Sequence, residues 1–137
     1  MEGMTGFTAA KKTVLIVDEE QKALIQLCEI LNGQYNVLTA TGGAQAIARS
    51  KEFKGKIDLL LTNLSMAEMT GIELASKIHV ERSEIKVLLM SRFPSGLLVL
   101  NEGWHFMPEP FIESQMRTLI TSLIAPTSKY SMAAVPA

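Results

Sequence analysis

Several short apolar runs in this sequence end in side chains that carry oxygen. The residues at these run ends are Asp18, Glu19, Glu20, Asn63, Ser91 and Glu109. Neighbouring carboxylates that converge with a third oxygen donor form a site for a hard cation such as Mg²⁺, which keeps several water molecules. Convergence requires the runs to be parallel strands, because the carboxyl ends of parallel strands meet at one edge of a sheet. The pattern therefore predicts an acidic pocket at a sheet edge.

The elements that would position these residues alternate between strand and helix patterns. Apolar runs of strand length occupy 13–17, 35–39, 57–62, 87–90 and 104–107. Residues at helical spacing are Leu24, Leu27, Cys28 and Leu31, then Ala44, Ile47 and Ala48, then Ile72, Leu74, Ala75 and Ile78, and finally Ile112, Met116, Leu119, Ile120, Leu123 and Ile124. This order predicts repeated βαβ units and an α/β fold with a parallel sheet. Residues 92–103 fit only one short, irregular helix around 97–101.

Length and composition indicate one packed domain. The chain has 137 residues, 47% of them hydrophobic and 20% charged, and a chain of this size can bury a single core. We expect the domain to cover 12–124, with disordered segments at 1–11 and 125–137. The net charge of -1 argues against direct nucleic-acid binding. Because no apolar stretch reaches ~20 residues, we expect no membrane span and a cytoplasmic location.

Four motifs in the predicted order resemble those of a response-regulator receiver domain. They are VLIVDEEQ at 14–21, DLLLTNLSMAEMTGIEL at 58–74, VLLMS ending at Ser91, and MPEPF at 107–111. The resemblance covers roughly residues 13–124. It implies a doubly wound, flavodoxin-like sheet of five parallel strands, with a fourth helix that is short or irregular here.

The resemblance also implies roles for single residues. Asp18 and Glu19 match the acidic pair that holds Mg²⁺, with Asn63 as the third metal position. Asn63 falls where the family carries the aspartate that accepts a phosphoryl group from a histidine kinase. Ser91 and Phe106 match the hydroxyl and aromatic residues of the switch that responds to phosphorylation.

Two departures from the family pattern predict a degenerate receiver. The amide of Asn63 cannot form an acyl phosphate, because that chemistry needs a carboxylate nucleophile. Glu109 stands where the family has a lysine, which reverses the charge beside the phosphoryl position. The carboxylates of Asp18, Glu19 and Glu109 should still attract cations, so we expect weak Mg²⁺ binding or an inward turn of Glu109 as a substitute ligand.

These residues predict a stand-alone, non-enzymatic receiver that acts by contact with a histidine kinase or another signalling protein. An alternative is a metal-dependent phosphoryl-transfer or hydrolytic domain that uses the same acidic pocket, although Ser65, the nearest hydroxyl, has no obvious base. Flavin binding would need a hydroxyl- and glycine-rich phosphate loop, whereas residues 18–22 read DEEQK. That acidic segment would repel phosphate.

Simpler interpretations stand beside these predictions. Taken alone, Asp18 and Glu19 also fit capping of the first helix, and Asn63 fits an ordinary turn. His79 and His105 lie on different predicted elements without a partner at ligand spacing, so we interpret them as ordinary surface or core histidines. Other aromatic residues gather near the fifth strand, where they predict either core packing or a homodimer face. These are Trp104, Phe106 and Phe111.

Overall fold

A computed structural model describes residues 7–8, 10–92 and 103–126. The strands are β1 (Thr13–Val17), β2 (Asn36–Ala40), β3 (Leu59–Asn63), β4 (Lys86–Ser91) and β5 (Trp104–Pro108). The helices are α1 (Gln21–Leu31), α2 (Gly43–Glu52), α3 (Gly71–Glu81) and α4 (Glu113–Leu123). The short helix predicted around 97–101 lies outside the described residues.

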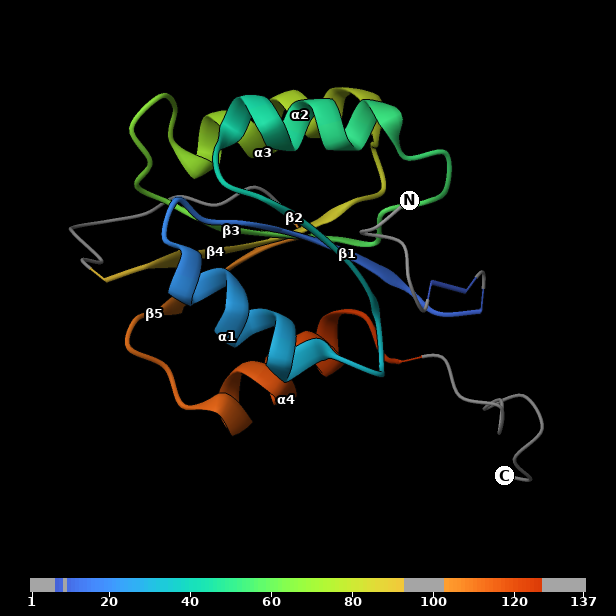
Figure 1. The fold of residues 1–137 in the computed structure, drawn as a ribbon, viewed down its shortest axis with the longest axis vertical. Coiled ribbons are helices and arrows are strands. Elements are labelled where there is room, and N and C mark those ends of the chain that lie inside the picture. Colours follow the sequence, from blue (N-terminus) through green and yellow to red (C-terminus); the bar gives the residue numbers. More distant parts are fainter. Residues whose placement is uncertain (1–6, 9, 93–102, 127–137) are drawn as a thin grey trace.

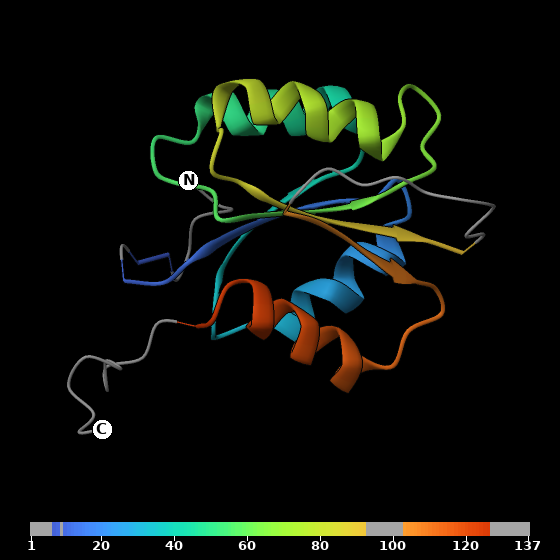
Figure 2. The same ribbon diagram turned by 180° about the vertical axis from the view of Figure 1, so that it is seen from behind.

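The strands form one parallel sheet in the order β2-β1-β3-β4-β5. Helices α1 and α4 cover one face, and α2 and α3 cover the other (Figures 1 and 2). This arrangement confirms the doubly wound, flavodoxin-like fold. The carboxyl ends of the strands lie together at the left edge of the sheet in Figure 1.

The burial of each strand follows from its place in the sheet. All five residues of β1 are buried, because this strand has a neighbour on each side and helices over both faces. The edge strand β2 instead alternates between buried and partly buried residues. Helix α1 ends at Asn32, and Gly33 follows with a φ of 86°, a conformation that glycine adopts without strain.

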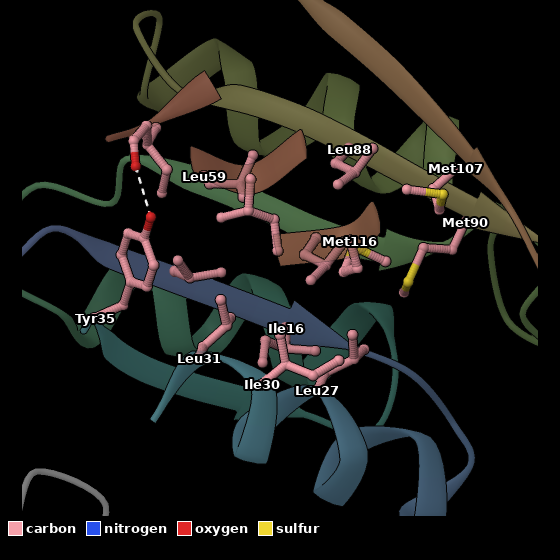
Figure 3. Packing of buried hydrophobic residues seen from close by; sticks show 14 of the residues in the cluster. Ile16, Leu27, Ile30, Leu31, Tyr35, Leu59, Leu88, Met90, Met107 and Met116 are labelled. Atoms are coloured by element: carbon pink, nitrogen blue, oxygen red, sulfur yellow. Dashed lines mark hydrogen bonds between the residues drawn. The ribbon is translucent and has the colours of Figure 1, made fainter. Parts of the chain in front are cut away.

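The core consists of two clusters, one on each face of the sheet. Figure 3 shows the cluster between the sheet and helices α1 and α4, where Ile16, Leu59 and Met116 pack. The second cluster lies under α2 and α3 and contains Leu60 and Leu74. Neither cluster needs a charged side chain to fill it.

Two predicted helix faces are wrong in detail. On α2 the buried side chains are Ala46 and Ser50, whereas Ala44 and Ala48 are exposed. At the start of α4 Ile112 is 62% exposed, because it precedes the first helical turn. Spacing alone left the phase of the α2 face open by one residue, whereas the rest of the α4 stripe is buried or packs against the core, as at Met116 and Ile120.

Contacts of the amino-terminal segment reach beyond the boundary predicted at residue 12. The Asn36 side chain accepts the Thr8 N–H at 3.0 Å and donates to the Thr8 carbonyl at 2.7 Å. Phe7 packs against Phe53 with ring centroids 6.2 Å apart. Thr8 is thus attached to the domain by hydrogen bonds between its backbone and Asn36, and Phe7 by its ring contact with Phe53.

Candidate functional site

The carboxyl edge of the sheet brings Asp18 and Asn63 together. The Asn63 Nδ2 donates to Asp18 Oδ2 at 3.3 Å, and Asp18 is only 3% exposed. The other oxygen of Asp18 accepts the Glu20 N–H at 2.9 Å. Glu20, rather than Asp18, is the N-cap residue of α1 and makes no side-chain cap there. Asp18 therefore faces the crevice and is not the N-cap.

The oxygen of Asn63 points toward the loop that follows β3. Asn63 Oδ1 accepts the Ser65 N–H at 2.9 Å, which closes a local turn. Gly71, where α3 begins, packs closely against the end of β3: a Cβ at Gly71 would lie 2.5 Å from the Asn63 carbonyl oxygen. Only glycine allows α3 to begin so close to this residue.

Glu19 lies on the same side of the crevice but reaches a different partner. Its Oε2 accepts the Ala67 N–H at 2.7 Å, across 48 residues of sequence. The long side chain of Glu19, which follows the neighbouring strand β1, thus holds the β3–α3 loop at the same edge of the sheet. The loop has a second contact at Glu68, whose Oε1 accepts the Ala44 N–H at 2.9 Å.

Ser91 and Glu109 form the other side of the crevice. Ser91 is 3% exposed, and its carbonyl accepts the Glu109 N–H at 2.8 Å. This bond sets the backbone of Glu109 directly beyond β5. Phe106 lies on β5 and is partly buried against the cluster under α2 and α3.

The pKa of the Glu109 carboxyl is raised above its ordinary value. Burial raises the pKa of Glu109, and the nearby carboxylates of Asp18 and Glu20 raise it further, while Arg92 lowers it. Glu109 therefore lies within electrostatic reach of the buried Asp18. Negative charge accumulates on both sides of the crevice.

These donors fit a divalent cation poorly. Asn63 presents its amide N–H, not its oxygen, to Asp18. Glu19 has already accepted a backbone N–H. In the described part of the chain, no three His, Cys, Asp or Glu side chains gather closely enough to hold a metal ion. Each of the two acids that the resemblance assigns to Mg²⁺ therefore already accepts at least one hydrogen bond.

The three aromatic residues predicted as core or as a homodimer face pack in or against the two clusters of the core. Trp104 is 8% exposed and belongs to the cluster under α2 and α3, whereas Phe111 packs against the cluster on the opposite side of the sheet. The chain crosses the sheet edge between them. The aromatics therefore contribute to both cores of the domain, and the homodimer face stays a prediction.

The two histidines and the cysteine lie on separate helices and strands. His79 is exposed on α3 and His105 is partly buried on β5, so the two histidines lie on separate elements. Cys28 packs against the first cluster, and burial raises the pKa of its thiol. Among the described residues no helix is long and apolar enough to cross a bilayer.

Sequence reasoning missed Glu68, Arg92 and the backbone N–H of Ala67. No pattern points to the Glu68 and Ala67 contacts, because each joins residues at least 24 positions apart. Arg92 could have been identified from the sequence as a residue of the crevice, since it directly follows Ser91. The positive charge of Arg92, which follows β4, lowers the pKa of Glu109, which follows β5.

Comparison with known proteins adds a family match to this geometry. Residues 14–97 match the model of the response regulator receiver domain. The chain is 34% identical over 83 residues to the response regulator protein VraR of Staphylococcus aureus, covering 58% of this chain and 39% of that protein. It is 22% identical over 128 residues to the sensor kinase CckA of Brucella abortus, covering 90% of this chain and 14% of that protein.

Solved structures include similar folds. A chain of the CheX–CheY–BeF3–Mg²⁺ complex from Borrelia burgdorferi superposes with a TM-score of 0.75 at 26% identity, covering 82% of this chain and 88% of that chain. The present chain spans less than half the length of the two curated relatives named above.

Proposed function

This chain belongs to the response regulator receiver domain family, and on that premise we propose that it is a receiver that works without accepting a phosphoryl group. As a receiver it is a module of two-component signalling, a class that generally acts without being an enzyme. The observation that carries the proposal is Asn63 at the end of β3, with its amide directed at Asp18.

The chemistry of the acceptor position supports this proposal. An aspartyl phosphate forms when a carboxylate oxygen attacks phosphorus, while cations neutralise the charge that develops on the phosphoryl oxygens. Asn63 has no such carboxylate. Glu109 adds negative charge at the position where the family supplies a lysine, so both the nucleophile and the counter-charge are missing.

The proposed site roles are those of a receiver that has kept its geometry. Asp18, Glu19 and Asn63 stand in the metal positions, Ser91 and Phe106 in the switch positions, and Glu109 in the lysine position. We propose at most weak Mg²⁺ binding, because the Asn63 amide and the Ala67 N–H already engage the acids. Bound Mg²⁺ would supply charge neutralisation at Asp18.

The output of such a receiver is contact with another protein. Receiver domains act with histidine kinases and other signalling proteins, and the CheY chain named above was solved with a protein partner. Exposed apolar side chains suit a contact of this kind here: Ile25 on α1 is 52% exposed, and Ile112 before α4 is 62% exposed. Ile25 lies in the amino-terminal half of α1, and Ile112 directly precedes α4. Both helices begin at the edge of the crevice.

The extent and location of the domain remain part of the proposal. We propose that it runs from 12 to 124, with Thr8 attached through Asn36 and Phe7 through Phe53, and that it works in the cytoplasm. No observation favours the hydrolytic alternative, since Ser65 is exposed and its N–H donates to Asn63.

Incubation with acetyl phosphate and Mg²⁺, followed by intact-mass measurement, tests the proposal. We expect the mass to stay unchanged, because Asn63 offers no carboxylate. A phosphorylatable receiver treated in the same way is the positive control. A mass gain of one phosphate on residue 63 or on any other residue of the crevice would contradict the proposal.

A further inference from the structure

A second concave site lies at the amino-terminal edge of the sheet, opposite the acidic crevice. It is a cavity of about 480 Å³ beside the starts of β1 and β3. Small-molecule sites commonly occupy about 300 to 1,000 Å³. The five residues of β1, at ~3.3 Å each, separate this cavity from Asp18, so the two sites do not share residues.

The lining of the cavity is basic, although the whole chain is slightly acidic. Lys11, Lys12 and Lys56 line it, and Asp58 is the single acid among those lining residues that the structure describes. Three lysines against one aspartate give the lining a formal charge of +2. The net charge of the chain is -1, so positive charge is concentrated at this edge.

Asp58 accepts a hydrogen bond from β1 and pairs with one of the lysines, so its negative charge is partly compensated. Its Oδ2 accepts the Thr13 N–H at 2.8 Å, and its Oδ1 lies 3.7 Å from the Lys56 Nζ. The Lys56 side chain is 66% exposed, which leaves its ammonium able to donate to a ligand. A lysine ammonium is a strong donor to phosphate oxygens.

An aromatic pair forms the apolar part of the lining. The rings of Phe7 and Phe53 meet edge to face, with an interplanar angle of 64°. Such rings pack well against a flat aromatic group of a ligand. The cavity thus combines a cationic part with an aromatic part.

The cavity wall from the α2–β3 loop is held in place by Arg82. Its guanidinium donates to the Phe53 carbonyl at 2.8 Å and to the Gly55 carbonyl at 2.9 Å. On the opposite wall, Asn36 holds the backbone of Thr8 and Lys11. Charged and aromatic side chains therefore project from fixed backbone.

We propose that this cavity binds a small organic anion that carries an aromatic ring next to a phosphate group, the chemistry of a mononucleotide. The lysines bind the phosphate and the phenylalanine rings contact the base. The proposal is independent of the function proposed for the crevice.

Calorimetric titration of the full chain with AMP, without Mg²⁺ and at low ionic strength, tests the proposal. Adenosine and inorganic phosphate are titrated in parallel. We expect AMP to bind saturably and at least about tenfold more tightly than either fragment, since adenosine lacks the charge-assisted hydrogen bonds of the phosphate and inorganic phosphate lacks the aromatic contact. Lys11→Gln and Lys56→Gln should each weaken AMP binding by about tenfold.

Lys77→Gln is the matched control, because Lys77 is exposed on α3 and does not line the cavity. Amide chemical shifts of the unmodified chain give a readout that does not depend on variants: AMP should shift Thr13, Gly55 and Asp58, not Asp18 and Asn63. Absence of saturable AMP binding would overturn the proposal. So would equal weakening by Lys77→Gln, phosphate binding as tightly as AMP, or shifts confined to the crevice.

Discussion

In the proposed assignment, Asn63 holds the acceptor position and Glu109 the lysine position, where they change the charge of the crevice in opposite senses relative to a phosphorylatable receiver. Asn63 removes one negative charge and adds an N–H donor toward Asp18. Glu109 adds a negative charge in place of a positive one. The uncharged Asn63 relieves charge repulsion at Asp18. Glu109, on the other side of the crevice, adds charge repulsion with Asp18 and Glu20.

Asn63→Asp alone should restore little phosphorylation, and Asn63→Asp combined with Glu109→Lys should restore more. The single variant regains the nucleophile but keeps Glu109 facing the phosphoryl oxygens. Labelling with acetyl phosphate and Mg²⁺, read by intact mass, measures the difference. Asn63→Asp with Glu109→Gln separates removal of the negative charge from gain of a positive one. Equal labelling of the single and the lysine double variant would show that Glu109 does not matter.

Glu109 should also make stability depend on pH. Burial, with help from Asp18, raises its pKa above the ordinary value of 4.5, so the folded chain holds this proton more tightly than the unfolded chain. Stability is therefore lost as pH rises from about 4.5 through the raised pKa. Glu109→Gln should be more stable than the parent at neutral pH, and the difference should shrink as the pH falls below that range.

Urea unfolding of both proteins between about pH 4 and pH 8 measures this effect. The gain should be small, because the Glu109 side chain is only partly buried and solvent screens it. Glu84→Gln removes an exposed carboxyl elsewhere and serves as the control. A stability difference that does not vary with pH would contradict the role given to Glu109.

At the level of elements, long-range contacts hold the loops around the crevice. The β3–α3 loop is bound by Glu19 at Ala67, and its Glu68 binds the Ala44 N–H at the start of α2. Helix α3 then begins with a capping box, in which Thr70 accepts the Glu73 N–H and Glu73 accepts the Thr70 N–H. The crevice loop is thus fixed at both ends by contacts within the protein.

Arg82 has the corresponding role at the carboxyl end of α2. It donates to the Ser50 side chain and to the carbonyls of Ser50, Phe53 and Gly55. The last carbonyls of a helix lack partners within the helix. Four hydrogen bonds from one guanidinium therefore join α3 to α2 and to the loop before β3.

Arg82→Ala should destabilise the chain by about 2 to 3 kcal/mol, because several carbonyls lose a charged donor at once. Arg82→Lys should recover only part of the loss, since an ammonium cannot reproduce the planar fork. Arg49→Ala is the control: Arg49 makes a single exposed bond to the Thr39 carbonyl and should cost less than about 1 kcal/mol. Chemical denaturation gives the values. Similar losses for both alanine variants would contradict this account.

Over the whole molecule, the sheet separates two apolar cores and two differently charged edges. Tyr35 links distant parts of the first core, since its hydroxyl donates to the Ile124 carbonyl at 2.8 Å, 89 residues away (Figure 3). This bond joins the start of β2 to the end of α4. It lies at the edge opposite the crevice.

Tyr35→Phe should therefore lower the free energy of unfolding by about 1 kcal/mol, because the buried Ile124 carbonyl loses its donor while the ring stays packed. Tyr35→Leu, which also removes the ring, should cost more. Equilibrium urea unfolding measures both variants. Crevice properties should not change in either, and a Tyr35→Phe variant as stable as the parent would show that the bond contributes nothing net.

Much of the fold followed from local pattern. Buried runs such as 13–17 and 57–62 specify strands covered on both faces, and the helical segments between them require parallel crossovers. Parallel strands then place their carboxyl ends at one edge, which explains why Asp18 and Asn63 could be expected to meet. Where local pattern was ambiguous, as on α2 and before α4, helical spacing did not identify the buried side chains: Ala44 and Ile112 are exposed.

The sequence by itself determined the sheet, the edge at which Asp18 and Asn63 lie, and the absence of a carboxylate at position 63, because chain direction and residue type are local properties. Only the tertiary structure decided that Glu19 binds the Ala67 N–H, that Trp104 and Phe111 belong to opposite cores, and that lysines from separate segments line one cavity. Those outcomes depend on the direction of side chains and on contacts between residues far apart in the chain, which no local spacing encodes.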